Sequence, residues 1–428
     1  MKKRHFQNKL IAELLSNCQK VPARCPHFLD CGGCSYQDFT YGDQIKVKEK
    51  KLKELFGDLT ADTNVSFQGG QEYGYRTRMD YIVSSQGLGL RRKRRFDQVV
   101  DLHECHLIDP AIFGFLRSIY EEGIKIGLIP YDLQSKTGFW RYLSVRVNEK
   151  NDFMVIVNTT SDEKLYPLVD ELIEKITNNI VGAGFSRLQL CEKGRENPAR
   201  TKVGNLVSIY HLINDGLNDD NFGEVRRWWG EEFLKFKILN PGSVSRTSFK
   251  FKIGPNTFFQ NSIELLNGLI TKLVGYIDAD DQVLDLYCGV GTLSLPVAKK
   301  AKQVLGVELM AESIELAKLN AIDNGITNVD FVVGEVEKII TNDELRIRNY
   351  DALVLDPPRK GLEKAASEIM EMDLQKIVYM SCNPLTLKKD LEVLTKKYRL
   401  VEASWWDLYP QTPHVEGLCL LVGDGVEL

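Results

Sequence analysis

Short apolar runs alternate with longer segments of helical period along the C-terminal part of the chain, from about Ile253 onward. The short runs predict buried strands at Val283–Leu286, Gln303–Glu308, Val329–Val333, Ala352–Asp356 and Ile377–Met380. Between them, the helical period predicts helices at Leu293–Lys300, Ala311–Asn324 and Leu385–Leu394. Such an alternation predicts an α/β fold with a doubly wound parallel sheet, whose last hairpin is Tyr398–Leu408 and Glu416–Val422.

The preceding part of the chain has a less regular pattern and predicts an α+β region. Its helices are expected at Tyr41–Phe56, Ala111–Leu128 and Glu163–Asn178. Its strands are expected at Tyr73–Tyr81, Trp140–Arg146, Phe153–Asn158, Phe185–Cys191 and Leu206–Leu212. The character of the sequence changes at Asn240–Lys252, where a loop rich in Pro, Gly and Ser precedes a basic, aromatic segment. We therefore expect a basic extension (residues 1–20), an α+β domain (residues 21–250) and a C-terminal α/β domain (residues 251–428).

Composition and charge exclude several classes of protein. The chain has 428 residues, 43% of them hydrophobic and 27% charged, as expected for a soluble protein of two or three domains. A net charge of −4 gives no overall attraction to nucleic acid. The N-terminus lacks the apolar core of a signal peptide, and no run reaches the roughly 20 apolar residues of a membrane span. We expect a cytoplasmic monomer that does not bind membranes.

Two local segments combine cationic and aromatic residues in spite of the negative net charge. Tyr73–Tyr81 alternates tyrosines with arginines, and Arg91–Arg95 is an unbroken run of five cationic residues. Arginines and aromatic rings together suit phosphates and unstacked RNA bases. A charged run of this kind also protects a sheet edge from aggregation, which is the simpler interpretation. We favour RNA binding.

Cysteines crowd near the N-terminus, where Cys25, Cys31 and Cys34 lie within ten residues. Cys105 is a plausible fourth ligand that the fold returns to the same place. An all-cysteine set suits either zinc or an iron–sulfur cluster, and the spacing alone does not separate them. Three free thiols brought together by chance are the simpler alternative, although cysteines rarely crowd in this way without binding a metal.

Polar residues follow several strands of the predicted parallel sheet. Asp285 precedes a turn that contains Gly289 and Gly291, and Glu308 ends the next strand. This pattern lacks the third glycine of a dinucleotide fingerprint and is typical of S-adenosylmethionine (SAM) sites. Asp356 ends a further strand beside the same crevice, and Gln260 precedes the sheet and is placed to close over the cofactor.

Cys382 lies between a predicted strand and a predicted helix, in the sequence Ser-Cys-Asn-Pro. A thiol at the carboxyl end of a strand faces the crevice where α/β proteins bind ligands and can act as a nucleophile. Buried cysteines more often only fill space in the core. Glu416 follows a histidine and precedes an apolar strand, which suits a partly desolvated general base, although it also fits an ordinary surface acid.

Together these motifs resemble the iron–sulfur-containing RNA uracil-C5 (5-methyluridine) methyltransferases, from about Cys25 to the C-terminus. The resemblance implies a Rossmann-like class I methyltransferase domain preceded by an iron–sulfur and RNA-binding domain. It implies a [4Fe–4S] cluster on Cys25, Cys31, Cys34 and Cys105, and a SAM site at Gln260, Tyr287, Glu308 and Asp356. It also implies Cys382 as nucleophile and Glu416 as base.

The resemblance implies the following reaction. The Cys382 thiolate adds to carbon 6 of a uridine extruded from ribosomal or transfer RNA, carbon 5 takes the methyl group, and Glu416 removes the carbon-5 proton. Many relatives carry an N-terminal oligonucleotide-binding barrel, and the residues before Cys25 are too few for one. RNA docking is therefore expected to depend on the cysteine region and the basic segments. The alternatives are an RNA cytosine-C5 methyltransferase, which usually has a second cysteine where Asp356-Pro-Pro-Arg stands here, and an RNA-binding protein without activity.

Overall fold

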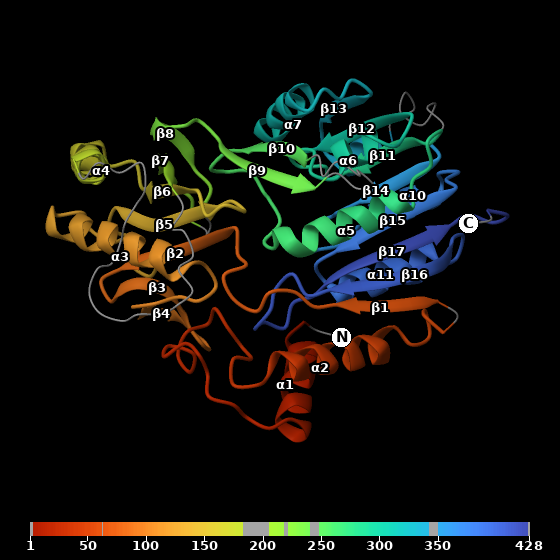
Figure 1. The fold of residues 1–428 in the computed structure, drawn as a ribbon, viewed down its shortest axis with the longest axis horizontal. Coiled ribbons are helices and arrows are strands. Elements are labelled where there is room, and N and C mark those ends of the chain that lie inside the picture. The colour runs from red at the N-terminus through yellow and green to blue at the C-terminus, as the bar shows by residue number, and fades with distance from the viewer. Residues whose placement is uncertain are drawn as a thin grey trace.

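The computed structural model describes residues 3–61, 63–182, 205–217, 221–239, 248–341 and 350–426. Two sheets lie side by side and their helices cover them, with the C-terminal sheet larger than the other (Figure 1). The strand predicted at Phe185–Cys191 and part of the predicted boundary segment, residues 240–247, lie outside the described residues. No helix in the described ranges combines the length and the apolar content needed to cross a membrane.

The first sheet has seven strands and forms the left half of the view in Figure 1. Its order is β4-β3-β2-β5-β6-β7-β8, and all neighbours are antiparallel except β6 and β7. Helices α3 (Pro110–Lys125) and α4 (Tyr166–Gly182) pack together over one face, and η1 (Glu163–Leu165) precedes α4. The strands are β2 (Arg78–Ser84), β3 (Gly87–Arg92), β4 (Arg95–Asp101), β5 (Trp140–Val147), β6 (Phe153–Thr159), β7 (Leu206–Ile213) and β8 (Glu224–Gly230). The predicted strand Tyr73–Tyr81 begins only at Arg78.

The second sheet has eight strands in the order β1-β16-β17-β15-β14-β11-β12-β13. All neighbours are parallel except β17, which runs antiparallel to both β15 and β16. The predicted parallel sheet and its final hairpin are thereby confirmed. The strands are β1 (Asn64–Gln68), β11 (Gln282–Leu286), β12 (Gln303–Glu308), β13 (Val329–Val333), β14 (Ala352–Leu355), β15 (Lys376–Ser381), β16 (Arg399–Trp406) and β17 (Glu416–Val422).

Helices cover both faces of this second sheet, which makes it doubly wound. One face buries apolar residues of α5 (Ile263–Gly275), α6 (Ser294–Ala298) and α7 (Ala311–Asp323). The opposite face buries residues of α1 (Lys3–Asn17), α2 (Tyr41–Phe56), α8 (Val336–Ile339), α10 (Ala365–Met370) and α11 (Pro384–Leu394). Strands with apolar residues on both faces are characteristic of such three-layer folds, and β14, β15 and β17 are buried along their whole length.

The N-terminal residues do not stay within the first sheet's domain. β1 pairs in parallel with β16 at the edge of the second sheet, and α2 packs in the core beneath it. The hairpin of β9 (Leu234–Leu239) and β10 (Ser248–Ile253) packs in the core that also holds α5 and α7. Residues 41–68 and 234–239, which the sequence places in the α+β domain, therefore belong structurally to the C-terminal core. This contact between distant segments holds the two halves of the molecule together.

Candidate active site

The loops that follow β11, β12, β14 and β15 meet at one edge of the second sheet, on the side that faces the first sheet (Figure 1). Asp285 is fully buried near the end of β11, and its Oδ2 accepts a hydrogen bond of 2.5 Å from the hydroxyl of Ser294. Its Oδ1 has no hydrogen-bond partner among the described residues. Burial raises the pKa of Asp285 to about 7, because desolvation penalises the charged carboxylate. An unpaired buried oxygen of this kind is suited to a polar or cationic ligand.

The turn after Asp285 has a backbone that most residues avoid. Tyr287 adopts a φ of 67°, and Gly289 and Gly291 adopt φ values of 55° and 84°. Non-glycine residues in this region are strained, and such strain concentrates at functional sites. A Cβ atom at Gly289 would meet no atom within 4 Å, so space for a ligand lies beside the turn. The backbone N–H of Gly289 donates to Oε2 of Glu308 over 3.2 Å, which fixes the acidic residue predicted at the end of β12.

Gln260 and Asp356 face each other across the crevice. The Nε2 of Gln260 donates to Oδ2 of Asp356 over 3.2 Å, and Oε1 of Gln260 has no partner among the described residues. Burial raises the pKa of Asp356 to about 7, and the hydrogen bond from Gln260 opposes that rise. A small cavity lies between these residues, and its other walls are Phe258, Tyr287, Cys288, Gly289, Val290, Thr292 and Leu293. Gln260, Tyr287 and Asp356 thus line one crevice, and Glu308 adjoins it through its hydrogen bond from Gly289.

Cys382 and Glu416 are brought together by the pairing of β15 and β17. Ser381 is the register partner of Gly417, so Cys382 follows β15 at the point where Glu416 begins β17. Both oxygens of Glu416 are buried without a hydrogen-bond partner in the described part of the chain. Burial is the main cause that raises the pKa of Glu416 well above its ordinary value, and Asp356 adds to it. Burial, followed by the charges of Glu416 and Asp356, raises the pKa of Cys382 to about 12.

The structure adds residues to the site that the sequence patterns left without a role. Arg359 interacts with Cys382 and Glu416, and its positive charge opposes the rise in both pKa values. Tyr409 is buried beside both residues and is hydrogen-bonded by the side chain of Asn261. Arg359 belongs to the Asp-Pro-Pro-Arg motif and Asn261 to the Phe-Phe-Gln-Asn segment, so each lies close to a residue, Asp356 or Gln260, that the sequence predicted for the SAM site. Their part in the site comes from tertiary contacts that connect separate loops.

A loop that leads from β16 to Glu416 is clamped by the N-terminal segment. The carbonyl of Gln411 accepts the backbone N–H groups of Ser35 and Tyr36 over 2.7 and 3.3 Å. Nε2 of Gln44 donates a hydrogen bond of 2.9 Å to Oε1 of Gln411, and Oε1 of Gln44 accepts one of 3.2 Å from the backbone N–H of Gln411. Gln411 holds a φ of 66°, a conformation that these contacts sustain. The cysteine region is therefore directly joined to the loop that carries Tyr409.

The four predicted metal ligands gather in one corner of the first domain. Cys31, Cys34 and Cys105 are buried in the same apolar cluster, and Cys25 packs against it. Burial raises the pKa of Cys31 to about 12 and of Cys34 to about 11, and their interaction with Cys105 adds to the rise. Within the described ranges, however, no three Cys, His, Asp or Glu side chains are arranged to hold a metal ion. The ligand geometry thus gives the predicted [4Fe–4S] cluster no direct support.

Comparisons with known proteins place the chain among RNA methyltransferases. Residues 235–423 match the family described as tRNA (uracil-5-)-methyltransferase. An RNA methyltransferase of Clostridium tetani is 33% identical, and the match covers 98% of this chain and 86% of that protein. The tRNA (uracil(54)-C(5))-methyltransferase of Pyrococcus horikoshii is 30% identical, over 94% of this chain and 86% of that one.

A solved structure resembles the whole molecule. The tRNA (uracil-54, C5)-methyltransferase of Pyrococcus abyssi, crystallised with S-adenosyl-L-homocysteine, superposes with a TM-score of 0.68 and 26% sequence identity. The match covers 92% of this chain and 86% of the other. The agreement therefore extends beyond the methyltransferase domain to the preceding domain.

Proposed function

The chain belongs to the tRNA (uracil-5-)-methyltransferase family, whose members are SAM-dependent RNA uracil-C5 methyltransferases, and from this premise we propose that its substrate is transfer RNA. Relatives from two Pyrococcus species carry names that specify uracil 54 of tRNA. This agreement favours tRNA over ribosomal RNA. It also favours uracil over the cytosine that the sequence left as an alternative.

The residues of the crevice fit SAM by the chemistry of their unpaired atoms. Asp285 and Asp356 offer carboxylate oxygens to the cationic part of such a molecule, and Gln260 offers an unpaired carbonyl oxygen. The Tyr287 hydroxyl is likewise buried without a partner in the described ranges. Glu308 is predicted to hold ribose hydroxyls, and exposed Leu309 and Met310 follow it with apolar surface suited to a purine. Bound SAM supplies an electrophilic methyl group to this crevice.

We propose that Cys382 is the nucleophile and Glu416 the base. Carbon 5 of uracil is a weak nucleophile. The Cys382 thiol loses its proton to solvent, which the positive charge of Arg359 favours, and the thiolate adds to carbon 6. The ring becomes an enolate that accepts the methyl group at carbon 5. Glu416 then takes the carbon-5 proton, and the thiolate leaves. A buried carboxylate with a raised pKa is suited to accept that proton. The observation that carries the proposal is the β15–β17 register, which joins these two residues beside the SAM crevice.

Two substitutions test this order of steps. Cys382→Ala should abolish methyl transfer and any covalent protein–RNA adduct while SAM binding stays near normal, because addition to carbon 6 cannot occur. Glu416→Gln should accumulate a methylated adduct that survives denaturing electrophoresis, since the carbon-5 proton stays and the thiolate cannot leave. Cys18→Ala, a thiol substitution remote from the crevice, is the matched control.

Two results would change the assignment. Normal turnover by Cys382→Ala would overturn the covalent mechanism. Wild-type behaviour of Glu416→Gln would reassign the base, with His414 as the next residue to test.

We also propose that Cys25, Cys31, Cys34 and Cys105 hold a [4Fe–4S] cluster. The support is the donor set, because four cysteines gather in one corner of the first domain and three of them, Cys31, Cys34 and Cys105, are buried there. An all-cysteine set of this kind is suited to an iron–sulfur cluster. Such a cluster would neutralise the mutual repulsion of the four thiolates.

A further inference from the structure

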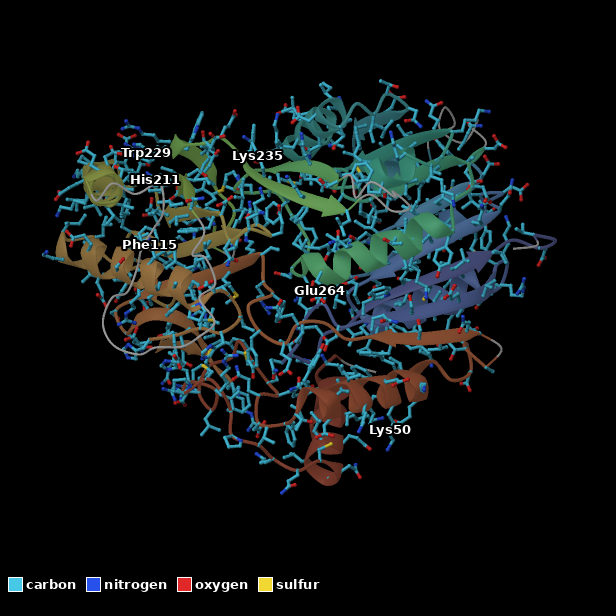
Figure 2. All side chains as sticks on the ribbon, in the orientation of Figure 1. Lys50, Phe115, His211, Trp229, Lys235 and Glu264 are labelled. Carbon is cyan, nitrogen blue, oxygen red and sulfur yellow. The ribbon has the colours of Figure 1, made fainter. Side chains whose placement is uncertain are left out.

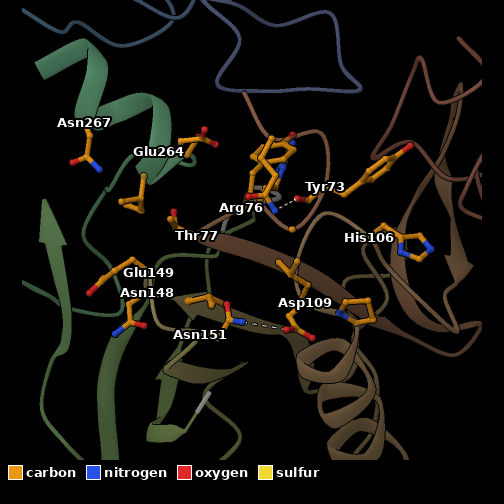
Figure 3. A pocket seen from close by; sticks show the side chains of 18 of the residues that line it. Tyr73, Arg76, Thr77, His106, Asp109, Asn148, Glu149, Asn151, Glu264 and Asn267 are labelled. Atoms are coloured by element: carbon orange, nitrogen blue, oxygen red, sulfur yellow. Dashed lines mark hydrogen bonds between the residues drawn. The ribbon is translucent and has the colours of Figure 1, made fainter. Parts of the chain in front are cut away.

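A second cavity, of about 620 Å³, lies between the two domains and is not part of the SAM crevice (Figure 3). We call it the interdomain pocket. Its walls come from the loop before β2, the start of α3, the β5–β6 turn and the start of α5. Tyr73, His106, Asn148 and Glu264 are among its lining residues. Its volume lies in the range of small-molecule sites and is large enough for one nucleotide.

Only one short segment separates the interdomain pocket from the catalytic crevice. Thr77, in the pocket wall, donates its hydroxyl to the Gln260 carbonyl over 2.8 Å and its backbone N–H to the Asn261 carbonyl over 3.1 Å. The side chains of these two residues lie on the crevice side, where Gln260 is hydrogen-bonded to Asp356 and Asn261 to Tyr409. The next residue, Ser262, returns to the pocket wall. A ligand in the pocket is therefore a close neighbour of whatever occupies the crevice.

One side of the pocket is aromatic and cationic. The guanidinium of Arg24 lies 4.9 Å from the centre of the Tyr73 ring, and the His106 ring meets the same tyrosine edge-on at 6.1 Å. Nδ1 of His106 and Nε of Arg76 are buried without hydrogen-bond partners among the described residues. Aromatic rings and guanidinium planes are the surfaces on which proteins stack unpaired nucleobases. Unpaired buried nitrogens beside them need a polar ligand to avoid a desolvation penalty.

Carboxylates also line the pocket. Glu264 is exposed in the first turn of α5 (Figures 2 and 3) and makes no hydrogen bond or ion pair with the described part of the chain. Asp109, on the same side as His106, and Glu149 each already accept a hydrogen bond, from Asn151 and from the backbone of Lys237. The three carboxylates repel a phosphate group and oppose the attraction of the cationic side for it. Carboxylates accept hydrogen bonds from the exocyclic amino groups of bases.

We propose that the interdomain pocket binds an unpaired nucleobase with an exocyclic amino group, from a nucleotide near the target uridine of the RNA substrate. The base stacks on the Tyr73 side and donates its amino group to Glu264, while its phosphates stay outside. The inference rests on the proposed function, because RNA must reach the neighbouring crevice. An amino-bearing base in this pocket would fix the distance along the strand between itself and the uridine that reaches Cys382. The pocket would thus take part in choosing which uridine is methylated.

Two variants test the pocket with a matched control. Glu264→Gln and Tyr73→Leu should each weaken RNA binding about tenfold, since a stacked base or a charge-assisted hydrogen bond contributes on that scale. Binding of SAM should not change, and neither should the rate of methyl transfer at saturating RNA. Glu315→Gln removes the same charge from an exposed position on α7 and should leave RNA affinity unaltered. Wild-type RNA affinity in both pocket variants would overturn the proposal.

Modified RNAs distinguish a base in the pocket from a general effect on the surface. Each guanosine, adenosine or cytidine near the target uridine is replaced in turn by inosine, purine riboside or 2-pyrimidinone riboside, respectively, which lack the amino group. One such RNA should bind wild-type protein less tightly and should show no further loss with Glu264→Gln. Equal losses with every RNA would contradict a specific base. If wild-type protein methylates no uridine at all, the proposed function fails; if it methylates RNA while pocket variants bind normally, only the pocket proposal fails.

Discussion

At the scale of single residues, the crevice gathers carboxyl groups whose charge is opposed by burial. Asp285 and Asp356 both have pKa values raised to about 7, mainly because burial penalises the charged form. Buried carboxyl groups with such raised pKa values are typical of functional sites, where a bound ligand stabilises their charged form. A ligand with a sulfonium and an ammonium group favours the charged carboxylates, so its binding and their ionisation are linked.

This linkage predicts how SAM binding depends on pH. Below pH 7 the two carboxyls are protonated, so affinity for SAM should rise with pH up to about 7, by at most about tenfold per unit for each group, and then level off. Calorimetric titration between pH 5.5 and 8.5 measures this profile. Asp285→Asn should flatten it and weaken binding above pH 7. An affinity that falls or stays constant across the same range in wild-type protein would contradict the linkage.

The free protein should show the opposite trend in stability. A carboxyl whose pKa is higher in the folded state than in the unfolded state binds its proton more tightly when folded. Its contribution to stability is therefore complete below about pH 4 and is lost as pH rises through about 7. In the wild-type protein without SAM, Asp285 should lower the free energy of unfolding by about 2–4 kcal/mol between pH 5 and pH 8, as measured by urea unfolding. In Asp285→Asn this decrease should be absent.

Residue types and spacing predicted most of the site, since Asp285, Glu308, Asp356 and Cys382 all follow or end strands in the sequence. Such positions are recognisable because strand ends in a parallel sheet meet at one edge. Arg359 and Tyr409 could not be assigned in this way, because their roles depend on which loops face one another. The interdomain pocket could not be predicted for the same reason, because its walls come from five separate parts of the chain: Arg24, the loop before β2, the start of α3, the β5–β6 turn and the start of α5.

At the scale of elements, the basic run Arg91–Arg95 spans the end of β3, the turn at Lys93 and Arg94, and the start of β4, and it contacts the cysteine loop. Gly32 donates its backbone N–H to the Arg91 carbonyl over 2.8 Å, and Lys93 donates its own to the Asp30 carbonyl over 2.7 Å. The ammonium group of Lys93 lies 3.8 Å from the centre of the Phe28 ring. Part of the predicted positive charge is neutralised locally, because Arg92 pairs with Asp30 and Arg95 with Asp97. The predicted RNA-binding role stays a prediction.

The ion pairs of Arg92 and Arg95 predict which cation of the basic run contributes most to RNA binding. Arg94 makes no ion pair with any described residue, so Arg94→Ala should lower the slope of log affinity against log salt by about one unit. Arg95→Ala should lower it less, since that guanidinium already pairs with Asp97. Filter binding between 50 and 300 mM salt measures both slopes. Unchanged slopes would identify the turn as a solvated sheet edge.

Element prediction succeeded where a mainly apolar run is flanked by turns. The predicted bounds of β12, β13 and β17 agree with the structure, although β13 is largely exposed and only Phe331 of it is buried. β1 and β8 were missed. β1 (Asn-Val-Ser-Phe-Gln) alternates polar and apolar residues, but it is a five-residue edge strand that is only partly buried, and so short a pattern is a weak signal. β8 has no such alternation and exposes most of its side chains. Only the distant partner, β16 for β1 and β7 for β8, makes them strands.

At the scale of the whole molecule, the N-terminal segment joins the cysteine corner to the catalytic loop. Ser35 follows Cys34 directly and donates to Gln411, and the fully buried pair of Lys48 and Asp407, 2.8 Å apart, fixes the start of that loop. Removing one side chain of a buried ion pair typically destabilises a protein by about 3–5 kcal/mol, so the loss of either Lys48 or Asp407 should weaken this junction. The hydroxyl of Tyr75 adds a hydrogen bond of 3.0 Å to the Pro410 carbonyl. These contacts predict that a change at the cysteines also affects the loop that ends at Glu416.

This connection gives the proposed cluster a measurable consequence. Protein purified without oxygen should be brown and contain about four iron and four acid-labile sulfide atoms per chain, as a cysteine-bound cubane requires. Removal of the iron with a chelator should leave Cys31 and Cys34 as protonated thiols around an unfilled centre, because burial raises the pKa of both, so the corner should lose its central cross-link and loosen. Hydrogen exchange should then increase at residues 31–36 and 407–412, and turnover should fall while SAM affinity changes little. Cys105→Ala should reproduce these changes, and Cys18→Ala should not. Stoichiometric zinc without sulfide would exclude the cluster, and exchange confined to residues 31–36 would show that the corner and the catalytic loop are independent.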